Sequence, residues 1–362
     1  MTGREIEFVE ESLRSGHLSG NGPFTKKCQG FFEQRYGFTK TFLTASCTDA
    51  LEMCALLCDL KPGDEVITPS YTFVSTANAF ALRGATIRFA DSLPDHPNVD
   101  PERIRELVNE NTRVVVVVHY AGAACNMDEI LELAAEHDLL VVEDAAQAID
   151  STFNGKPLGS LGDMAAFSFH ETKNIQCGQG GLAVVNNRDF LDRAEFAWEK
   201  GTNRSQFVRG LVDKYSWVSL GSSYLAAEPV AALLWPQLLA LDQIQSRRCQ
   251  IWDRYRDGLQ CLEGLVELPL VPKMASRNGH LYHLVLESQS RADEFRAYLA
   301  ESGVASVTHY VPLHSSPYFY SQHDGRALPN AERFADCLVR LPLFPTLSDE
   351  DVVRVVDLTK RF

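Results

Sequence analysis

Between residues 40 and 200, short apolar runs alternate with segments of helical periodicity. The apolar runs predict strands at residues 66–68, 86–90, 113–119, 139–143 and 165–169. The helical spacing predicts helices at residues 48–59, 75–83, 101–109 and 127–136. The five consecutive valines at 114–118 are apolar on both faces, which is typical of a strand that helices cover on both sides. This alternation predicts an α/β fold with a mostly parallel sheet between two layers of helices.

The remainder of the chain follows a different pattern. A predicted helix at 189–200 is followed by an irregular segment and then by a long apolar helix at 228–245. Beyond it, the pattern predicts an α+β arrangement, with strands at 280–286 and 305–311 and helices at 291–301 and 349–360. We therefore expect a large domain of residues 1–245, with an N-terminal arm, and a small domain of residues 246–362.

Charge and composition exclude several classes of protein. The chain has 362 residues and a formal net charge of −14, whereas broad binding to nucleic acid or anionic membranes needs clustered Lys and Arg. No segment approaches the roughly 20 apolar residues that span a bilayer, and the N-terminus carries no apolar signal core. The nine cysteines are scattered without a paired spacing, which indicates reduced thiols in a cytoplasm and no metal site.

Two residues that follow predicted strands can carry cofactor chemistry. In LLVVEDAAQ, Asp144 ends a buried strand, at the edge where ligands of open α/β sheets bind. A buried acid needs a positive partner, and a protonated pyridine nitrogen is one; capping of a following helix is the structural alternative. In FSFHETKN, Lys173 follows another strand. A partly desolvated lysine has a lowered pKa and can form an imine, although a surface lysine in a loop is the commoner case.

A phosphate site is predicted upstream. The segment LTASCTDALEM predicts a strand, a tight turn and a helix that begins near Cys47 or Thr48. The free amides and positive dipole end of such a helix bind phosphate, with the Thr48 hydroxyl and the Asp49 backbone amide as donors. Ser168, five residues before the lysine, is a second hydroxyl candidate. Simple capping of the helix by Ser46 or Thr48 explains the same pattern.

Aromatic and polar residues near other strand ends complete the candidate site. Phe73 can stack on a planar ring or belong to the core, and Gln147 can donate to a ring oxygen or lie on a helix surface. In HYVPLHSSPYF, the side chains of His309, Tyr310 and His314 suit hydrogen bonds to sugar hydroxyls or phosphates. Because side chains alternate along a strand, we expect at most one of His309 and Tyr310 to face a given cleft.

Eight segments taken together resemble the DegT/StrS family of sugar-nucleotide aminotransferases. They are SCTDALEM, GDEVITPSYTFVSTANA, VHYAG, VVEDAAQ, FSFHETKN, KGTNRSQF, GSSYL and HYVPLH. Each alone is a weak signal, but the eight occur in the family's order and spacing over essentially the whole chain. Within the family, the likeness is greatest to the dTDP-4-amino-4,6-dideoxygalactose transaminases. The resemblance implies the aspartate-aminotransferase (type I) fold, pyridoxal 5′-phosphate (PLP) as cofactor, and a homodimer with active sites at the subunit interface.

The resemblance also implies roles for individual residues. Lys173 matches the lysine that binds PLP covalently, and Asp144 matches the partner of the pyridine nitrogen. Gln147 matches the residue near the phenolic oxygen, and Phe73 matches the aromatic that stacks on the ring. The resemblance also implies phosphate contacts by Cys47, Thr48 and Asp49 at the start of the helix, and by Ser168 in the strand before the lysine.

One position departs from the family pattern. Many members carry GxNxR where this chain has GSSYL, and that asparagine reaches the cofactor phosphate of the neighbouring subunit. Ser223 stands in its place and is shorter, so we expect Arg204, Arg209 or Lys214 to contribute to that contact. The candidates for binding substrate are Asn21, Arg204, Lys214, His309, Tyr310 and His314.

The activity implied by the family is transfer of an amino group from L-glutamate to a dTDP-linked 4-keto-6-deoxy sugar. A PLP-dependent sugar dehydratase is a weaker alternative, because members of that branch carry His where this chain has Lys173. A non-catalytic protein on the same scaffold would not need Asp144, Gln147 and Lys173 together. A nicotinamide oxidoreductase is disfavoured because no GxGxxG follows an early strand.

Overall fold

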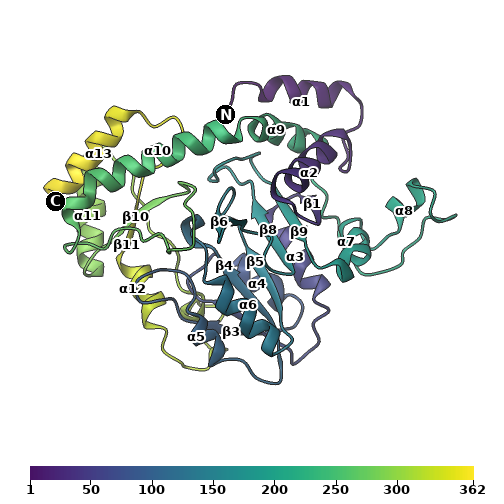
Figure 1. The fold of residues 1–362 in the computed structure, drawn as a ribbon, viewed down its shortest axis with the longest axis horizontal. Helices are drawn as coiled ribbons and strands as arrows, with labels where there is room; N and C mark the ends of the chain where they lie inside the picture. Colours follow the sequence, from purple (N-terminus) through teal and green to yellow (C-terminus); the bar gives the residue numbers. More distant parts are fainter.

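The computed structural model describes residues 1–362 and has a seven-stranded sheet at its centre (Figure 1). In spatial order, the strands are β1 (Lys40–Thr44), β9 (Gly181–Val185), β8 (Met164–Ser168), β5 (Leu140–Asp144), β4 (Thr112–Val118), β2 (Glu65–Pro69) and β3 (Thr86–Ala90). Strand β9 runs antiparallel to β1 and β8, and every other neighbouring pair is parallel. The predicted mostly parallel α/β sheet is confirmed.

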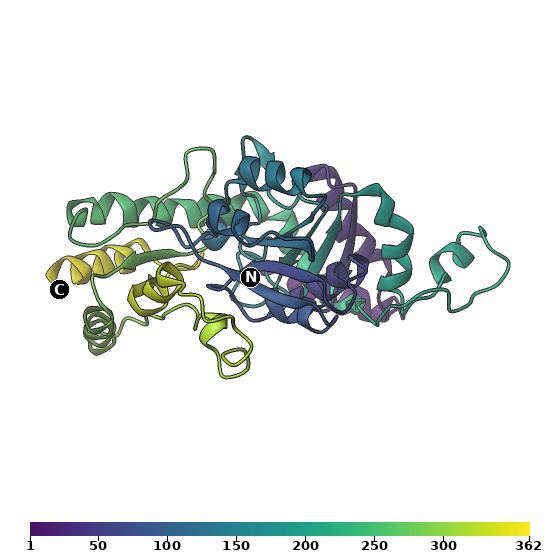
Figure 2. The same ribbon diagram turned by 90° about the horizontal axis from the view of Figure 1, so that it is seen from below.

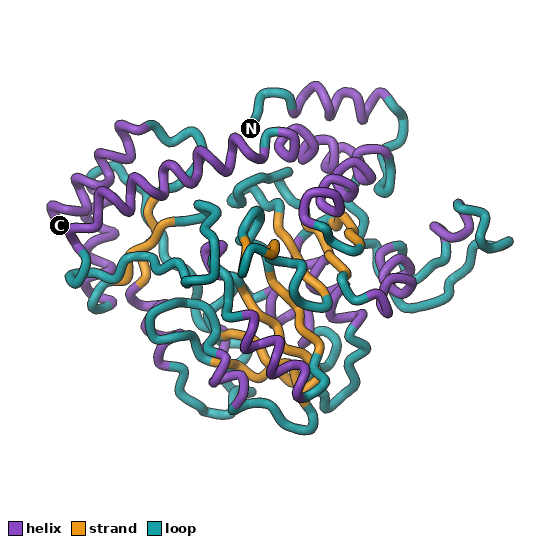
Figure 3. Tube along the Cα trace, in the orientation of Figure 1, coloured by secondary structure: helices purple, strands orange, loops and turns teal.

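Helices cover both faces of this sheet, because alternate residues of each strand point to opposite sides. One face packs against α1 (Glu5–Arg14), α2 (Pro23–Tyr36), α5 (Pro101–Arg105), α6 (Met127–Glu136) and α9 (Glu228–Leu239). The other face packs against α3 (Cys47–Leu57), α4 (Ser75–Ala81) and α7 (Leu191–Trp198). In the valine run, Val115 and Val117 belong to the first core and Val114 and Val116 to the second. Figure 3 shows the strands enclosed by the two helical layers.

The C-terminal part of the chain has a third hydrophobic core. Helix α10 (Leu241–Leu259) packs there with α11 (Gln289–Glu301), α13 (Asp349–Arg361) and a two-stranded sheet of β10 (Tyr282–Val285) and β11 (Leu338–Leu341). Helix α12 (Pro329–Cys337) instead packs against the core that includes α3 and α4. The division at residue 245 lies inside α10 and stays a prediction. None of the helices is long and apolar enough to cross a membrane.

Several elements differ from those predicted. The helix predicted at 228–245 is two helices, because the backbone leaves the helical conformation at Ala240 (φ −101°, ψ 11°), shortly after Pro236. The strand predicted at 305–311 is absent, since only Val307 pairs there, in an isolated bridge with Arg340. Turns follow β5, so Asp144 caps no helix. Strands β9 and β11 and helix α12 were not predicted from the sequence pattern.

One segment extends away from the rest of the molecule. It comprises residues 199–222, contains the short helix α8 (Arg204–Val208), and projects at the right of Figures 1 and 2. We call it the arm. Its apolar side chains are exposed, including Val208, Leu211 and Trp217. A chain that leaves such side chains in water is expected to cover them with a partner.

Candidate active site

A cavity of about 490 Å³ lies at the carboxyl ends of the central parallel strands. Its walls come from the start of α3, from the ends of β4, β5 and β8, and from the C-terminal part of the chain. The structure brings nine of the predicted site residues to this cavity: Cys47, Thr48, Phe73, Asp144, Gln147, Ser168, Lys173, His309 and Tyr310.

Asp144 lies at the end of β5 and is 5% exposed. Its Oδ2 accepts a hydrogen bond from the Thr76 hydroxyl at 2.7 Å, and its Oδ1 accepts one from the Ala146 amide at 3.2 Å. Burial raises the pKa of the Asp144 carboxyl, against the opposing effect of these two hydrogen bonds. No cation of the chain forms an ion pair with it, so the ionised carboxylate needs a positive group from a ligand.

Lys173 lies in the turn after β8, where its amide donates to the carbonyl oxygen of His170 at 2.9 Å. Its ammonium group forms no hydrogen bond and no ion pair with the chain. Burial lowers the pKa of Lys173, and the charges of Cys47 and Asp144 oppose that shift. Both side chains face the same cavity, so a lysine with a depressed pKa and a buried acid are available to one ligand.

The start of α3 lines the cavity with the positive end of its helix dipole. Ser46 is the N-cap, and its Oγ accepts a hydrogen bond from the Asp49 amide at 3.0 Å. Because Ser46 does the capping, the Thr48 hydroxyl is left to line the cavity, where it lies 2.7 Å from the Ser75 hydroxyl. Gly181 lets β9 approach this turn, since a side chain there would collide with the backbone of Ser46.

The phosphate contact of the Asp49 amide stays a prediction. Its amide is already used by the Ser46 cap, and its side chain is absent from the cavity wall. Ser168, by contrast, lies at the end of β8 on the wall, as predicted from its position before the lysine.

Gln147, His309 and Tyr310 lie together on one wall of the cavity. Gln147 accepts from the Ala121 amide at 2.7 Å and donates to the Tyr310 hydroxyl at 2.9 Å. The rings of His309 and Tyr310 stack with centroids 4.2 Å apart, and both line the cavity. The prediction that at most one of them faces a cleft is wrong. Side chains alternate only along an extended strand, and this segment is not one.

Phe73 is 57% exposed and lines the cavity rather than the core. Its ring centroid is 6.5 Å from that of Tyr310. An aromatic side chain with one face uncovered is suited to stacking on a planar ligand.

Six predicted residues lie outside this wall. They are Asn21, Asp49, Arg204, Lys214, Ser223 and His314. Asn21 donates to the Glu199 carboxylate at 2.7 Å. His314 is buried between Ser70 and Glu332, with hydrogen bonds of 2.7 Å and 3.2 Å.

The basic residues of the arm differ in their partners. Arg209 forms hydrogen bonds of 2.7 Å and 2.6 Å with Glu195, and Arg204 lies 3.6 Å from Glu199. Lys214 is exposed and forms no ion pair. Of the three, Lys214 is thus the cation most available to a ligand or a second subunit.

The sequence pattern did not identify three residues of the site, which are Arg340, His280 and Thr76. Arg340 and His280 line the cavity, and the Thr76 hydroxyl donates a hydrogen bond to Asp144. Arg340 is the only charged residue in the apolar run LVRLPL, and that isolated charge is the signal that could have identified it. His280 and Thr76 give no such signal, because their positions depend on contacts between distant segments.

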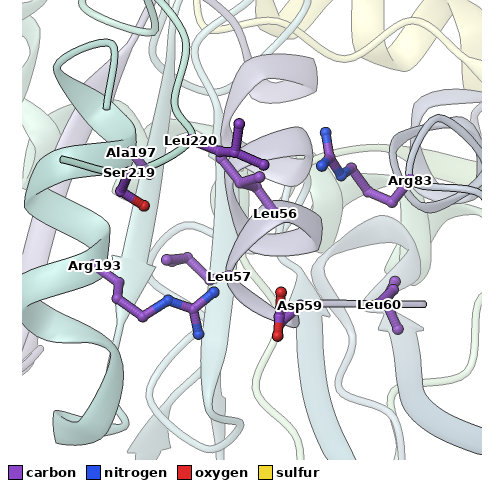
Figure 4. Close-up of a pocket in the computed structure, with 9 residues that line it drawn as sticks. All are labelled: Leu56, Leu57, Asp59, Leu60, Arg83, Arg193, Ala197, Ser219 and Leu220. Carbon is purple, nitrogen blue, oxygen red and sulfur yellow. The ribbon is translucent and has the colours of Figure 1, made fainter. Parts of the chain in front are cut away.

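A second, smaller cavity of about 260 Å³ lies at the other end of α3 (Figure 4). Leucines of α3 and the arm lie between Arg193 on one side and Arg83 on the other. Both arginines are exposed, and the cavity contains no histidine, cysteine or lysine. It therefore lacks the lysine that imine chemistry requires.

Comparison with known proteins shows the family of the chain. The model of the DegT/DnrJ/EryC1/StrS aminotransferase family matches residues 1–360. The chain belongs to this family. Spore coat polysaccharide biosynthesis protein SpsC of Bacillus subtilis strain 168 is 35% identical, over 98% of this chain and 93% of the relative. This DegT/StrS chain is a sugar aminotransferase.

Solved structures of similar proteins agree with the family. The structure of S. venezuelae DesV, in complex with a ketimine intermediate, superposes with a TM-score of 0.90 at 31% identity, covering 99% of this chain and 94% of that chain. Spr1654 from Streptococcus pneumoniae in its PLP form gives a TM-score of 0.91 at 26% identity, covering 100% and 97%. The DegT/StrS chain therefore has the type I PLP-transferase fold, and PLP is its cofactor.

Proposed function

We propose that this enzyme transfers the amino group of L-glutamate to a dTDP-linked 4-keto-6-deoxy sugar, giving a dTDP-4-amino sugar for polysaccharide or antibiotic biosynthesis. The observation that carries the proposal is the convergence of Asp144 and Lys173 on one cavity of about 490 Å³. The choice of dTDP and of the C4 position is supported by the likeness of eight sequence segments to the dTDP-4-amino-4,6-dideoxygalactose transaminases.

The side chains around the cavity fit PLP. Asp144 is a buried acid without a cation, which suits a protonated pyridine nitrogen. Lys173 is an amine without a partner, and the start of α3 with Thr48 and Ser168 offers donors to a phosphate. Phe73 and Gln147 are placed to contact the ring. Bound PLP would supply an electron sink for the carbanion that forms when the donor loses its α-proton.

Lys173 and Asp144 have distinct roles in this proposal. The Nζ of Lys173 takes the α-proton of the donor in one half-reaction, and in the other it delivers a proton to one face of the sugar carbon, which sets the configuration of the new amine. Its lowered pKa favours the neutral amine that such a base requires. The Asp144 carboxylate would hold a proton on the ring nitrogen of the bound cofactor, and hydrogen bonds from Thr76 and the Ala146 amide fix the orientation of that carboxylate.

We further propose that the enzyme is a homodimer with shared active sites. The arm carries exposed apolar side chains and the unpaired Lys214, and it projects away from the rest of the chain in Figures 1 and 2. Ser223 lies at its base and is exposed. These residues are placed to reach a second subunit, and Lys214 is the proposed contact to the partner's cofactor phosphate. All nine cysteines are free, which supports the cytoplasm as the compartment.

The proposed reaction is tested with purified protein, PLP and L-glutamate against a panel of keto sugars. The panel contains dTDP-4-keto-6-deoxy sugars and the matching UDP- and GDP-linked compounds, and mass spectrometry detects the amino sugar. We expect amination of the dTDP-linked 4-keto sugar with release of 2-oxoglutarate. The Lys173→Ala variant should lower the rate by about 10²- to 10⁴-fold.

Two results would contradict the proposal. Amination of only a UDP- or GDP-linked sugar would show that the nucleotide is wrong. Failure of glutamate to react, while another amino acid serves as donor, would show that the donor is wrong and leave sugar amination intact.

A further inference from the structure

A buried network of amide side chains surrounds Asn174, the residue that follows Lys173. Asn174 is 5% exposed, and its Nδ2 donates to Oε1 of Gln245 at 2.8 Å and to the main-chain carbonyl oxygen of Asn278 at 3.0 Å. The Nδ2 of Asn278 donates in turn to the carbonyl oxygen of Gln147 at 2.7 Å. The network therefore joins the chain beside the reacting lysine to the segment that carries Gln147.

His280 belongs to the same network, and its contact with Asn174 fixes its tautomer. The Nδ1 of His280 lies 2.8 Å from Oδ1 of Asn174. A main-chain carbonyl only accepts, so the carbonyl of Asn278 requires the Nδ2 side of the Asn174 amide, and Oδ1 is left to face the imidazole. An amide oxygen also only accepts, so the ring proton of His280 is on Nδ1. Its Nε2 is then an acceptor, and it forms no hydrogen bond with the chain.

The ring of His280 is neutral near neutral pH. It is 6% exposed, and burial lowers the pKa of His280 well below its usual value. The titratable groups that lower this pKa further are Lys173, Arg248, Arg340 and His309. Of these, Lys173 has the largest effect, so its amine lies within electrostatic reach of the ring. Nε2 of His280 therefore offers a lone pair, and not a proton, to the group nearest it.

Lys173 and His280 have complementary hydrogen-bonding groups in one cavity. Both residues line the cavity, and neither Nζ of Lys173 nor Nε2 of His280 has a partner in the chain. Other acceptors of the wall are already engaged, since Asp144 accepts two hydrogen bonds and Nε2 of His309 accepts from Arg340. The flexible four-carbon stem of a lysine lets its Nζ move within such a cavity. An acceptor for one N–H would fix the rotation of the amine and thus the direction of its lone pair.

We propose that Nε2 of His280 accepts a hydrogen bond from Nζ of Lys173 whenever that amine is free of the cofactor, and so holds it where it takes and returns the proton. His280 is then a positioning residue, because it acts through Lys173. The proposal rests on the proposed function in one respect, that Lys173 is the base.

The test uses two variants that separate the two nitrogens of the ring. In His280→Asn, the side-chain amide can replace Nδ1 as the donor to Asn174, but it is too short to place an acceptor at the position of Nε2. In His280→Gln, the longer side chain can place its carbonyl oxygen near that position, but the donor at Nδ1 is lost. His96→Asn, at a histidine that is 2% exposed and lies outside the cavity wall, is the matched control.

Two measurements are made on each protein. In the full-length chain freed of cofactor, peptide mass spectrometry follows the rate at which acetic anhydride acetylates Lys173 as the pH is varied, and the midpoint gives the pKa of Lys173. In the PLP-loaded enzyme, single-turnover release of 2-oxoglutarate from L-glutamate gives the rate constant of the donor half-reaction and the apparent affinity for the donor.

We expect His280→Asn to lower the pKa of Lys173 by about 1 to 2 units, because an acceptor stabilises the ammonium form more than the amine. The single-turnover rate constant should fall by about 10- to 100-fold, the effect of a misplaced reacting group, while the affinity for the donor stays unchanged. His280→Gln should stay closer to the wild type in both measurements, because it keeps an acceptor. His96→Asn should match the wild type.

Other outcomes overturn the proposal. If His280→Gln loses as much as His280→Asn, or more, the ring acts through its contact with Asn174 and its role is structural. An unchanged pKa of Lys173 in His280→Asn would show that Nε2 does not contact the amine. A loss confined to the affinity for the donor would assign Nε2 to the donor instead. The acetylation measurement needs no substrate, so an error in the proposed donor or sugar and an error about His280 are seen separately.

Discussion

At the scale of single residues, the chemistry depends on charges that the chain leaves unpaired. Asp144 is buried with two hydrogen bonds and no cation, so in the cofactor-free protein its ionisation opposes folding. Its pKa is raised in the folded state by burial, and the folded protein therefore holds that proton more tightly than the unfolded chain does. Stability is then lost as the pH rises above the unfolded value of about 3.9 towards the raised folded value.

Asp144→Asn should therefore stabilise the cofactor-free protein. The gain in Tm should be small near pH 4, grow as the pH rises, and level off once the wild-type carboxyl is ionised. Thermal unfolding from pH 4 to pH 8 measures it, with Asp189→Asn, at an exposed acid, as the control. Added PLP should stabilise the wild type more than the variant. A variant that is less stable than wild type without PLP at pH 8 would contradict this account.

The sequence predicted those residues of the site that lie at the ends of strands. Asp144, Ser168 and Lys173 could be found because the carboxyl ends of parallel strands meet at one edge of a sheet. Arg340 and His280 could not, because they reach the cavity only through the packing of the C-terminal part against the large sheet. The error about His309 and Tyr310 came from applying strand alternation to a segment that forms no strand.

At the scale of secondary-structure elements, local patterns predicted the strands and helices of the parallel core well. They missed β9, because its pairing with β1 joins residues far apart in sequence. They also merged α9 and α10, because the apolar spacing continues across the break at Ala240. Pairing and helix breaks of this kind depend on contacts that a local window does not contain.

Helix α2 shows such a distant contact. Its N-cap is Gly22, which offers no side-chain oxygen, and the amides of the first turn are satisfied by Glu228 of α9. The Glu228 carboxylate is 1% exposed and accepts from the amides of Gly22 at 3.0 Å, Phe24 at 2.8 Å and Thr25 at 3.0 Å. One buried acid thus joins the start of α2 to α9.

Glu228→Ala should destabilise the protein by about 2–5 kcal/mol, because it leaves several buried amides without acceptors. Glu228→Gln should lose less, since its amide oxygen can still accept one or two of these hydrogen bonds. Urea unfolding measures both effects, and Glu129→Ala, at an exposed acid of α6, should stay within about 0.5 kcal/mol of wild type. A loss below that value in Glu228→Ala would show that α2 does not depend on this carboxylate.

At the scale of the whole molecule, the arm is the feature that a single chain does not explain. Trp217 is 78% exposed and Leu211 is 67% exposed, on a segment that packs against little of its own chain. Large apolar side chains in such a position are typical of an interface core. The proposed homodimer would bury them and place Ser223 and Lys214 near the second subunit.

The double variant Leu211→Asp, Trp217→Asp should separate the subunits. Two buried anions at the interface should raise the dimer Kd by at least about 100-fold, while circular dichroism stays unchanged because both positions are exposed in the single chain. Sedimentation velocity measures the change, and Val353→Asp, on exposed surface of α13, is the control. A wild type that sediments as a monomer would contradict the shared site.

The central claim is that Lys173 and Asp144 act on one bound PLP, and reduction of the loaded enzyme with borohydride tests it most directly. Reduction fixes the cofactor to whichever lysine holds it, and peptide mass spectrometry identifies that residue. We predict the adduct on the peptide that contains Lys173, and its absence in Lys173→Ala. An adduct on any other lysine of the wild type, or none in protein saturated with PLP, would contradict the account.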